Sequence, residues 1–307
     1  MSKKLPGIVA IVCVLLLTGC LEFAQQTLSY RYDVKTDTLR IFQAYQGIFG
    51  EDKQDGLSDK ELDQLQSVLS GQRTFFFANW IWEYDRESMR KELDNLNKPD
   101  TPQDTKRDPA THARQAAFFK LLLDNVRVEN GPFYLDGQGR LCGIQFVTVK
   151  RFSKLVAAAN EQIRDLLKLE AGRENVSAED RALYLKFAGQ RQPYITVKGN
   201  QLTVRFPLTG KEYEKSFGPA TSAAKQMDEL KQWGDLFVFA DNEMKWSIGT
   251  PSDQTTVRTL SVSEKPYIPN ALEAVKSRAI VHEKMDIAAA AKAFVQGTPQ
   301  ERTPPKP

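Results

Sequence analysis

Two residue types that often take part in covalent catalysis, cysteine and histidine, are scarce in this chain. They comprise three cysteines (Cys13, Cys20 and Cys142) and two histidines (His112 and His282). A thiol becomes a strong nucleophile when a histidine serves as its base, which makes Cys142 with His282 or His112 the natural catalytic candidate. Cys142, however, stands in the apolar run Leu141-Cys142-Gly143-Ile144, where a free cysteine is usually a small buried hydrophobe with a raised pKa. The sequence therefore predicts a structural thiol and assigns no catalytic residue.

Parts of the chain resemble metal-binding and nucleotide-binding motifs but lack the spacing or the residues that those motifs require. The acidic stretch at 51–58 resembles a calcium loop, but Gly56 stands five residues before Glu61 and the motif requires six. Ser58 and Glu61 instead have the spacing of a capping box, which predicts a helix. The glycines at 137, 139 and 143 lack the nucleotide-binding spacing and indicate a turn. Two histidines in different halves do not make a histidine metal site, so we expect no metal and no cofactor.

The first twenty residues have the layout of a secretory signal. Lys3 and Lys4 precede an apolar run, 5–17, and small residues then lead to Cys20. A helix that spans a bilayer needs about 20 apolar residues, and this run is shorter and contains Pro6. We therefore expect residues 1–19 to be a signal peptide that is removed.

The end of this segment, Leu17-Thr18-Gly19-Cys20, resembles the lipobox of bacterial lipoprotein precursors. The resemblance covers only the leader, and it implies that Cys20 is lipidated and that the leader is cut before it. Two or three acyl chains hold a protein stably on a bilayer, whereas one binds marginally. Leu21 after the cysteine resembles the pattern exported to the outer membrane in Gram-negative lipoproteins. An uncleaved anchor and a soluble secreted form are the alternatives.

Composition limits the class of partner. Removing the first 19 residues, which carry two lysines, leaves 288 residues with 40 basic and 39 acidic side chains. A protein that binds nucleic acid needs a clear excess of basic side chains, so nucleic acid is not expected as a partner. Cys13 leaves with the leader and Cys20 is lipidated, so Cys142 has no partner for an intramolecular disulfide.

The elements that must position these residues begin with an N-terminal hairpin. Apolar residues alternate with polar ones from Leu28 to Val34, which is typical of a strand, and residues 36–38 form the turn to a second strand at 39–45. The aromatic stretch 75–82 predicts a strand buried on both faces. A helix is expected from Asp85 or Arg86 to Leu96.

The later part alternates between helical and strand patterns. Pro109 is predicted as the first residue of a helix, and Ser177 as the N-cap of another. The remaining helices are expected at 152–169, 222–233, 271–278 and 285–295, and the strands at 126–128, 133–135, 141–149, 194–197, 202–206, 236–239, 244–248 and 256–262.

These elements predict an α+β fold with antiparallel hairpins and sheets packed by several amphipathic helices. The loop at 97–111 carries three prolines and no large apolar residue, which makes it the best internal boundary. The predicted organisation is a signal peptide at 1–19, a lipid tether at 20–26, an N-terminal α+β part at 27–96, a hinge at 97–111, a main α+β part at 112–296 and a disordered tail at 297–307.

The function expected from these features is that of a membrane-anchored lipoprotein of the bacterial cell envelope, facing the periplasm from the outer membrane if the source is Gram-negative. Its partners would be the bilayer, through acylated Cys20, and an envelope protein, cell-wall material or an apolar ligand. We expect a non-enzymatic binding or structural module. The alternative is an envelope hydrolase with a site assembled from scattered residues. Clustered titratable groups in a pocket would favour the hydrolase, and an exposed aromatic patch the binding module.

Overall fold

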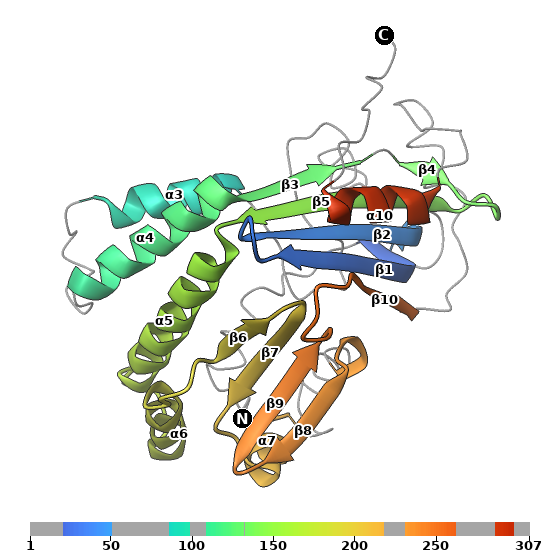
Figure 1. Ribbon diagram of the computed structural model, residues 1–307. Coiled ribbons are helices and arrows are strands. Elements are labelled where there is room, and N and C mark those ends of the chain that lie inside the picture. The colour runs from blue at the N-terminus through green and yellow to red at the C-terminus, as the bar shows by residue number, and fades with distance from the viewer. Residues whose placement is uncertain are drawn as a thin grey trace. The chain divides into compact units, whose positions relative to one another are not determined.

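A computed structural model describes residues 21–50, 86–98, 109–131, 133–217, 231–261 and 286–297 (Figure 1). Its helices and two antiparallel sheets confirm the α+β prediction. Several sequence predictions lie outside the described residues: the leader, Cys20, the helix from Ser58, the strand at 75–82, the helix at 271–278, His282 and most of the tail. Within the described residues, no helix is both long and apolar enough to cross a membrane.

The described chain forms two compact units that interleave along the sequence. Unit 1 takes its described residues from 86–125 and 151–252, and unit 2 from 21–50, 126–150 and 253–297. Most of the predicted boundary, 97–111, lies outside the described residues. The units interleave because of strand pairing: the segment 126–150 adds its strands to the N-terminal hairpin.

Unit 2 is built on one antiparallel sheet with the strand order β10-β1-β2-β5-β3, and the short β4 also pairs with β5. The strands are β1 (Leu21–Asp33), β2 (Thr38–Gly50), β3 (Val126–Asn130), β4 (Tyr134–Leu135), β5 (Leu141–Lys150) and β10 (Thr256–Ser261). The predicted N-terminal hairpin is confirmed, with Leu28 opposite Gln43. It is longer than predicted, because residues 21–26 are paired strand where a tether was expected.

Helix α10 (Ile287–Gln296) covers one face of this sheet. Its Ala291 and Val295 pack on Phe42, Ala44 and Ile144 of the strands. The Asp286 carboxylate accepts a hydrogen bond from the Ala289 N–H at 2.9 Å and caps the start of the helix. The Arg40 guanidinium lies beside Gly297 at the other end, where the helix dipole favours a cation.

Unit 1 combines helices with a second antiparallel sheet of order β6-β7-β9-β8. Its strands are β6 (Ile195–Lys198), β7 (Gln201–Phe206), β8 (Leu236–Ala240) and β9 (Glu243–Ile248), and its helices are α3 (Arg86–Leu96), α4 (Pro109–Asn125), α5 (Phe152–Ala171), α6 (Ala178–Ala188) and α7 (Gly210–Phe217). Helix α7 was not predicted. Thr209 and Glu212 form its capping box, since the Glu212 N–H donates to Thr209 Oγ1 and the Thr209 N–H to Glu212 Oε2.

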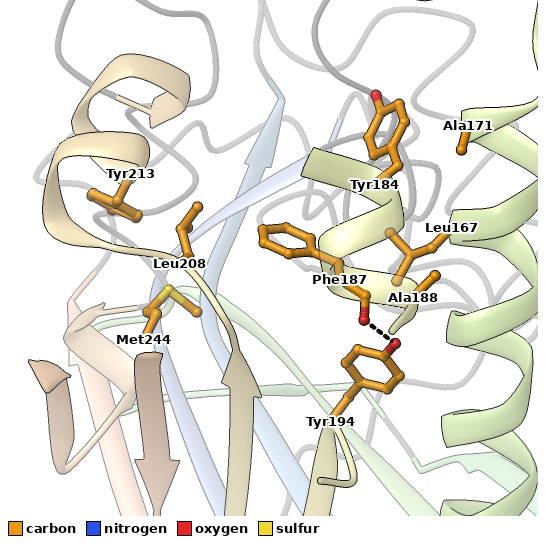
Figure 2. Packing of buried hydrophobic residues seen from close by; sticks show 9 residues of the cluster. All are labelled: Leu167, Ala171, Tyr184, Phe187, Ala188, Tyr194, Leu208, Tyr213 and Met244. Atoms are coloured by element: carbon orange, nitrogen blue, oxygen red, sulfur yellow. Dashed lines mark hydrogen bonds between the residues drawn. The ribbon is translucent and has the colours of Figure 1, made fainter. Parts of the chain in front are cut away.

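The core of unit 1 joins α5, α6, α7 and the sheet (Figure 2). Phe187 of α6 is 1% exposed and its ring lies 5.9 Å from that of Phe206. The Tyr194 hydroxyl donates to the Phe187 carbonyl at 2.6 Å, so Tyr194 is buried with its hydroxyl group hydrogen-bonded. The buried cluster consists of Leu167, Ala171, Tyr184, Phe187, Ala188, Tyr194, Leu208, Tyr213 and Met244.

Two polar contacts fix helix α5 in unit 1. Arg114 of α4 donates from Nε and Nη2 to both oxygens of Asp165, at 2.6 and 3.0 Å, a two-pronged pair that sets the helices in register. The Asn160 side chain bonds both backbone groups of Ile195, donating to its oxygen at 2.9 Å and accepting from its N–H at 2.8 Å. The start of β6 is thereby attached to α5.

Candidate functional site

The predicted lipidation site, Cys20, lies outside the described residues, but the strand that follows it is described. Strand β1 begins at Leu21, which pairs with Gly50 of β2. Its other edge is bonded to β10, so β1 is an inner strand of the sheet. A group attached at residue 20 would therefore be joined to a paired strand without an intervening flexible segment.

Cys142 is buried in the core of unit 2, as the sequence predicts. The side chain is fully buried, and its thiol donates to the Arg140 carbonyl at 3.3 Å. Burial raises the pKa of this thiol to about 11, although a backbone hydrogen bond from Gly47 acts in the opposite direction. Burial also raises the pKa of the Tyr134 phenol, which lies opposite Cys142 in the strand pairing. A thiol in this setting stays protonated at neutral pH and is a poor nucleophile.

We expect Cys142 to react with thiol reagents slowly in the native state and rapidly after denaturation. Its folded pKa lies above its usual value of 9, so its contribution to stability is present below pH 9 and is lost as the pH rises towards 11. The loss amounts to about 2–3 kcal/mol, at roughly 1.4 kcal/mol per pKa unit. This loss is measured by urea denaturation of the wild type and of Cys142→Ala at pH 8 and pH 11. The effects of the other titrating groups cancel when the change in the variant is subtracted from the change in the wild type. Rapid native labelling at neutral pH would contradict the assignment.

His112 is the candidate base that the structure describes. His112, in the first turn of α4, is half-buried, and its Nε2 is enclosed without a hydrogen-bond partner among the described residues. It belongs to unit 1, whereas Cys142 belongs to unit 2. Among the described residues, no group of three or more potential metal ligands comes together.

A row of polar side chains that the sequence did not single out crosses the buried sheet of unit 2. Gln26, Gln43 and Gln145 come from β1, β2 and β5 and are at most 2% exposed. Gln26 Nε2 donates to Gln43 Oε1 at 3.1 Å, and Gln145 Nε2 donates to Asn130 Oδ1 of β3 at 2.8 Å. The Tyr45 hydroxyl lies 2.9 and 3.0 Å from the Gln43 and Gln145 oxygens and, with one proton, donates to one of them at a time.

This row fixes the register of the strands and offers no catalytic acid, base or nucleophile. Side-chain amides do not titrate near neutral pH. A one-residue slip of any strand would turn its amide to the opposite face of the sheet and break the hydrogen bonds of the row. A sequence signal was present, because Gln43 occupies an inward position between Ile41 and Tyr45 in an otherwise apolar alternation.

An aromatic group lies on α7 and β8 of unit 1. The rings of Tyr213, Phe237 and Phe239 have centroids 5.0 to 5.5 Å apart. Lys231 Nζ lies 5.3 Å from the centroids of both Tyr213 and Phe237, within the range of a cation–π interaction. Phe239 is 38% exposed, so the group reaches the surface at β8.

Comparison with known proteins gives no match: no family model, no curated protein and no solved structure corresponds to this chain.

Proposed function

We propose that the protein is a lipid-anchored lipoprotein of the bacterial cell envelope that acts as a non-enzymatic binding or structural module. The observation that carries the proposal is the position of β1, which starts one residue after the lipobox cysteine, pairs with β2 from Leu21 onward and pairs with β10 from Gln25 to Tyr30. Tension on an anchor at Cys20 would act on a 13-residue strand of the sheet. A peptide joined directly to a long paired strand suits a protein held at a membrane.

The character of the Cys142 thiol supports a module without covalent catalysis. Cys142 is enclosed and has a raised pKa, which argues against its use as the nucleophile of a hydrolase. Phe239 is 38% exposed and presents an aromatic side chain at the surface, and aromatic side chains are enriched where proteins hold their partners. With Leu21 after Cys20, we place the protein at the outer membrane facing the periplasm in a Gram-negative cell.

Replacement of Cys20 by serine is expected to abolish acylation and membrane attachment, because serine has no thiol to receive the lipid. The unprocessed precursor should accumulate. Metabolic labelling with an alkyne fatty acid, fractionation and mass spectrometry of the mature N-terminus measure the three effects.

The matched control for this test is Cys142→Ala, which removes the other thiol of the mature chain and should leave labelling and attachment unchanged. An unmodified amino terminus upstream of Cys20 in the wild-type protein, or equal fatty-acid labelling of Cys20→Ser, would rule the anchor out.

A further inference from the structure

The sheet of unit 1 has a polar face opposite its core. Met244 of β9 belongs to the core cluster, and side chains alternate along a strand, so Glu243, Lys245 and Ser247 point to the other side. The register places Thr203 opposite Ser247 and Arg205 opposite Lys245 on that same side. These five residues, Thr203, Arg205, Glu243, Lys245 and Ser247, are called the polar face below.

Two cations lie directly across from each other on the polar face. The Arg205 N–H donates to the Tyr194 carbonyl at 2.7 Å, so the Arg205 backbone bonds away from β9. Arg205 and Lys245 are therefore a non-hydrogen-bonded pair, the type whose Cα atoms approach to about 4.5 Å and whose side chains are closest. Like charges in this position repel each other.

Among the described residues, one of the two cations has an ion-pair partner and the other has none. Lys245 Nζ lies 3.1 Å from Glu243 Oε2, in a pair whose side chains are 28% and 19% exposed. Arg205 Nε is enclosed without a hydrogen-bond partner among the described residues. Within the polar face itself, two positive charges thus stand against one negative charge.

A hydroxyl on the same face is also unused. Ser247 is 2% exposed, and its Oγ has no hydrogen-bond partner among the described residues. Thr203, directly opposite, adds a second hydroxyl. Buried polar groups in folded proteins are nearly always paired, so an unpaired guanidinium nitrogen and an unpaired hydroxyl on the same face of one sheet call for an explanation.

We infer that the polar face of the unit 1 sheet binds a phosphate group, held by Arg205 and Ser247 with Lys245 and Thr203 beside them. A phosphate oxyanion accepts several charge-assisted hydrogen bonds at once, and a guanidinium fork matches it in shape. Its negative charge also removes the repulsion between Arg205 and Lys245. The phosphate belongs either to a lipid headgroup or to a soluble phosphate compound.

The test uses the full chain in neutral detergent, titrated with sodium phosphate against sodium chloride of equal ionic strength. Calorimetry and thermal melting are expected to show phosphate binding and a phosphate-dependent rise in melting temperature. Arg205→Gln should weaken binding by about tenfold or more, since it removes the charge and the fork. Ser247→Ala should weaken it by about threefold or more, through one donor.

The matched control is Arg191→Gln, which removes an exposed arginine of the same unit and should leave phosphate affinity unchanged. Arg205→Gln should melt at or above the wild-type temperature in phosphate-free buffer, because the repulsion is gone. If that variant does not fold, Ser247→Ala carries the test. Equal responses to phosphate and chloride in the wild type, or equal phosphate affinity in Ser247→Ala and the wild type, would overturn the inference.

A second arm separates the sources of the phosphate. Dihexanoyl phosphatidic acid, used below its micelle concentration, presents a phosphomonoester headgroup. Binding tighter than that of inorganic phosphate, and dependent on Arg205, assigns the site to a lipid headgroup; equal affinity assigns it to soluble phosphate. Arg205-independent binding of both ligands would contradict the site.

Discussion

Phe187→Ala is expected to lower the free energy of unfolding of unit 1 by about 3–5 kcal/mol, a large share of the usual stability of a domain. The ring is 1% exposed and packs on Phe206 inside the cluster of Figure 2. Its removal leaves a cavity that helix α6 and the sheet cannot both close. The residue's carbonyl also accepts from Tyr194, so a shift of α6 would disturb that hydrogen bond.

The control for this prediction lies on the same helix. Leu185 is 54% exposed, and Leu185→Ala should change stability by less than about 0.5 kcal/mol. Urea denaturation followed by circular dichroism gives the two free energies, and the rate of Cys142 labelling reports on unit 2 separately. Similar losses for the two variants would mean that Phe187 is not a core residue.

Gly199→Ala is expected to cost about 2–5 kcal/mol, for two reasons that add. The turn between β6 and β7 holds Gly199 at φ +56°, a left-handed conformation that costs an L-residue about 1–2 kcal/mol. A Cβ there would also lie 2.6 Å from the backbone oxygen of Ser252 and 2.8 Å from its nitrogen, so the chain must shift, at about 1–3 kcal/mol. The shift would break the bond from the Asn200 N–H to that oxygen.

Gly137→Ala is the matched control, because a Cβ at Gly137 meets no atom within 4 Å. Its effect should stay within about 0.5 kcal/mol. Thermal melting of the two variants and the wild type gives the comparison, and equal melting temperatures for Gly199→Ala and the wild type would show that the turn tolerates a side chain.

Local signals explain most of what could be predicted. Ser177 was predicted as an N-cap, and its Oγ accepts from the Asp180 N–H at 3.0 Å at the start of α6. The predicted strands at 236–239 and 244–248 are joined by a turn in which Asp241 and Asn242 both have positive φ, as a tight hairpin requires. Helix α7 carried the same type of signal in Thr209 and Glu212, which form its capping box, but the helix was not predicted.

The sequence by itself determined most of the described elements, since caps, turns and periodicities act over a few residues. The hairpin of β1 and β2 and the buried character of Cys142 follow from such short patterns, and the proposed lipobox at Cys20 rests on one as well.

Only the tertiary structure decided which strands meet. Thr27 bonds Thr259 across 232 positions of the sequence, and the amides of Gln43 and Gln145 meet only because β2 pairs with β5. The facing cations Arg205 and Lys245 likewise depend on the pairing of β7 with β9. Pairing between distant strands is selected by the packing of the whole sheet, and no local pattern encodes that selection.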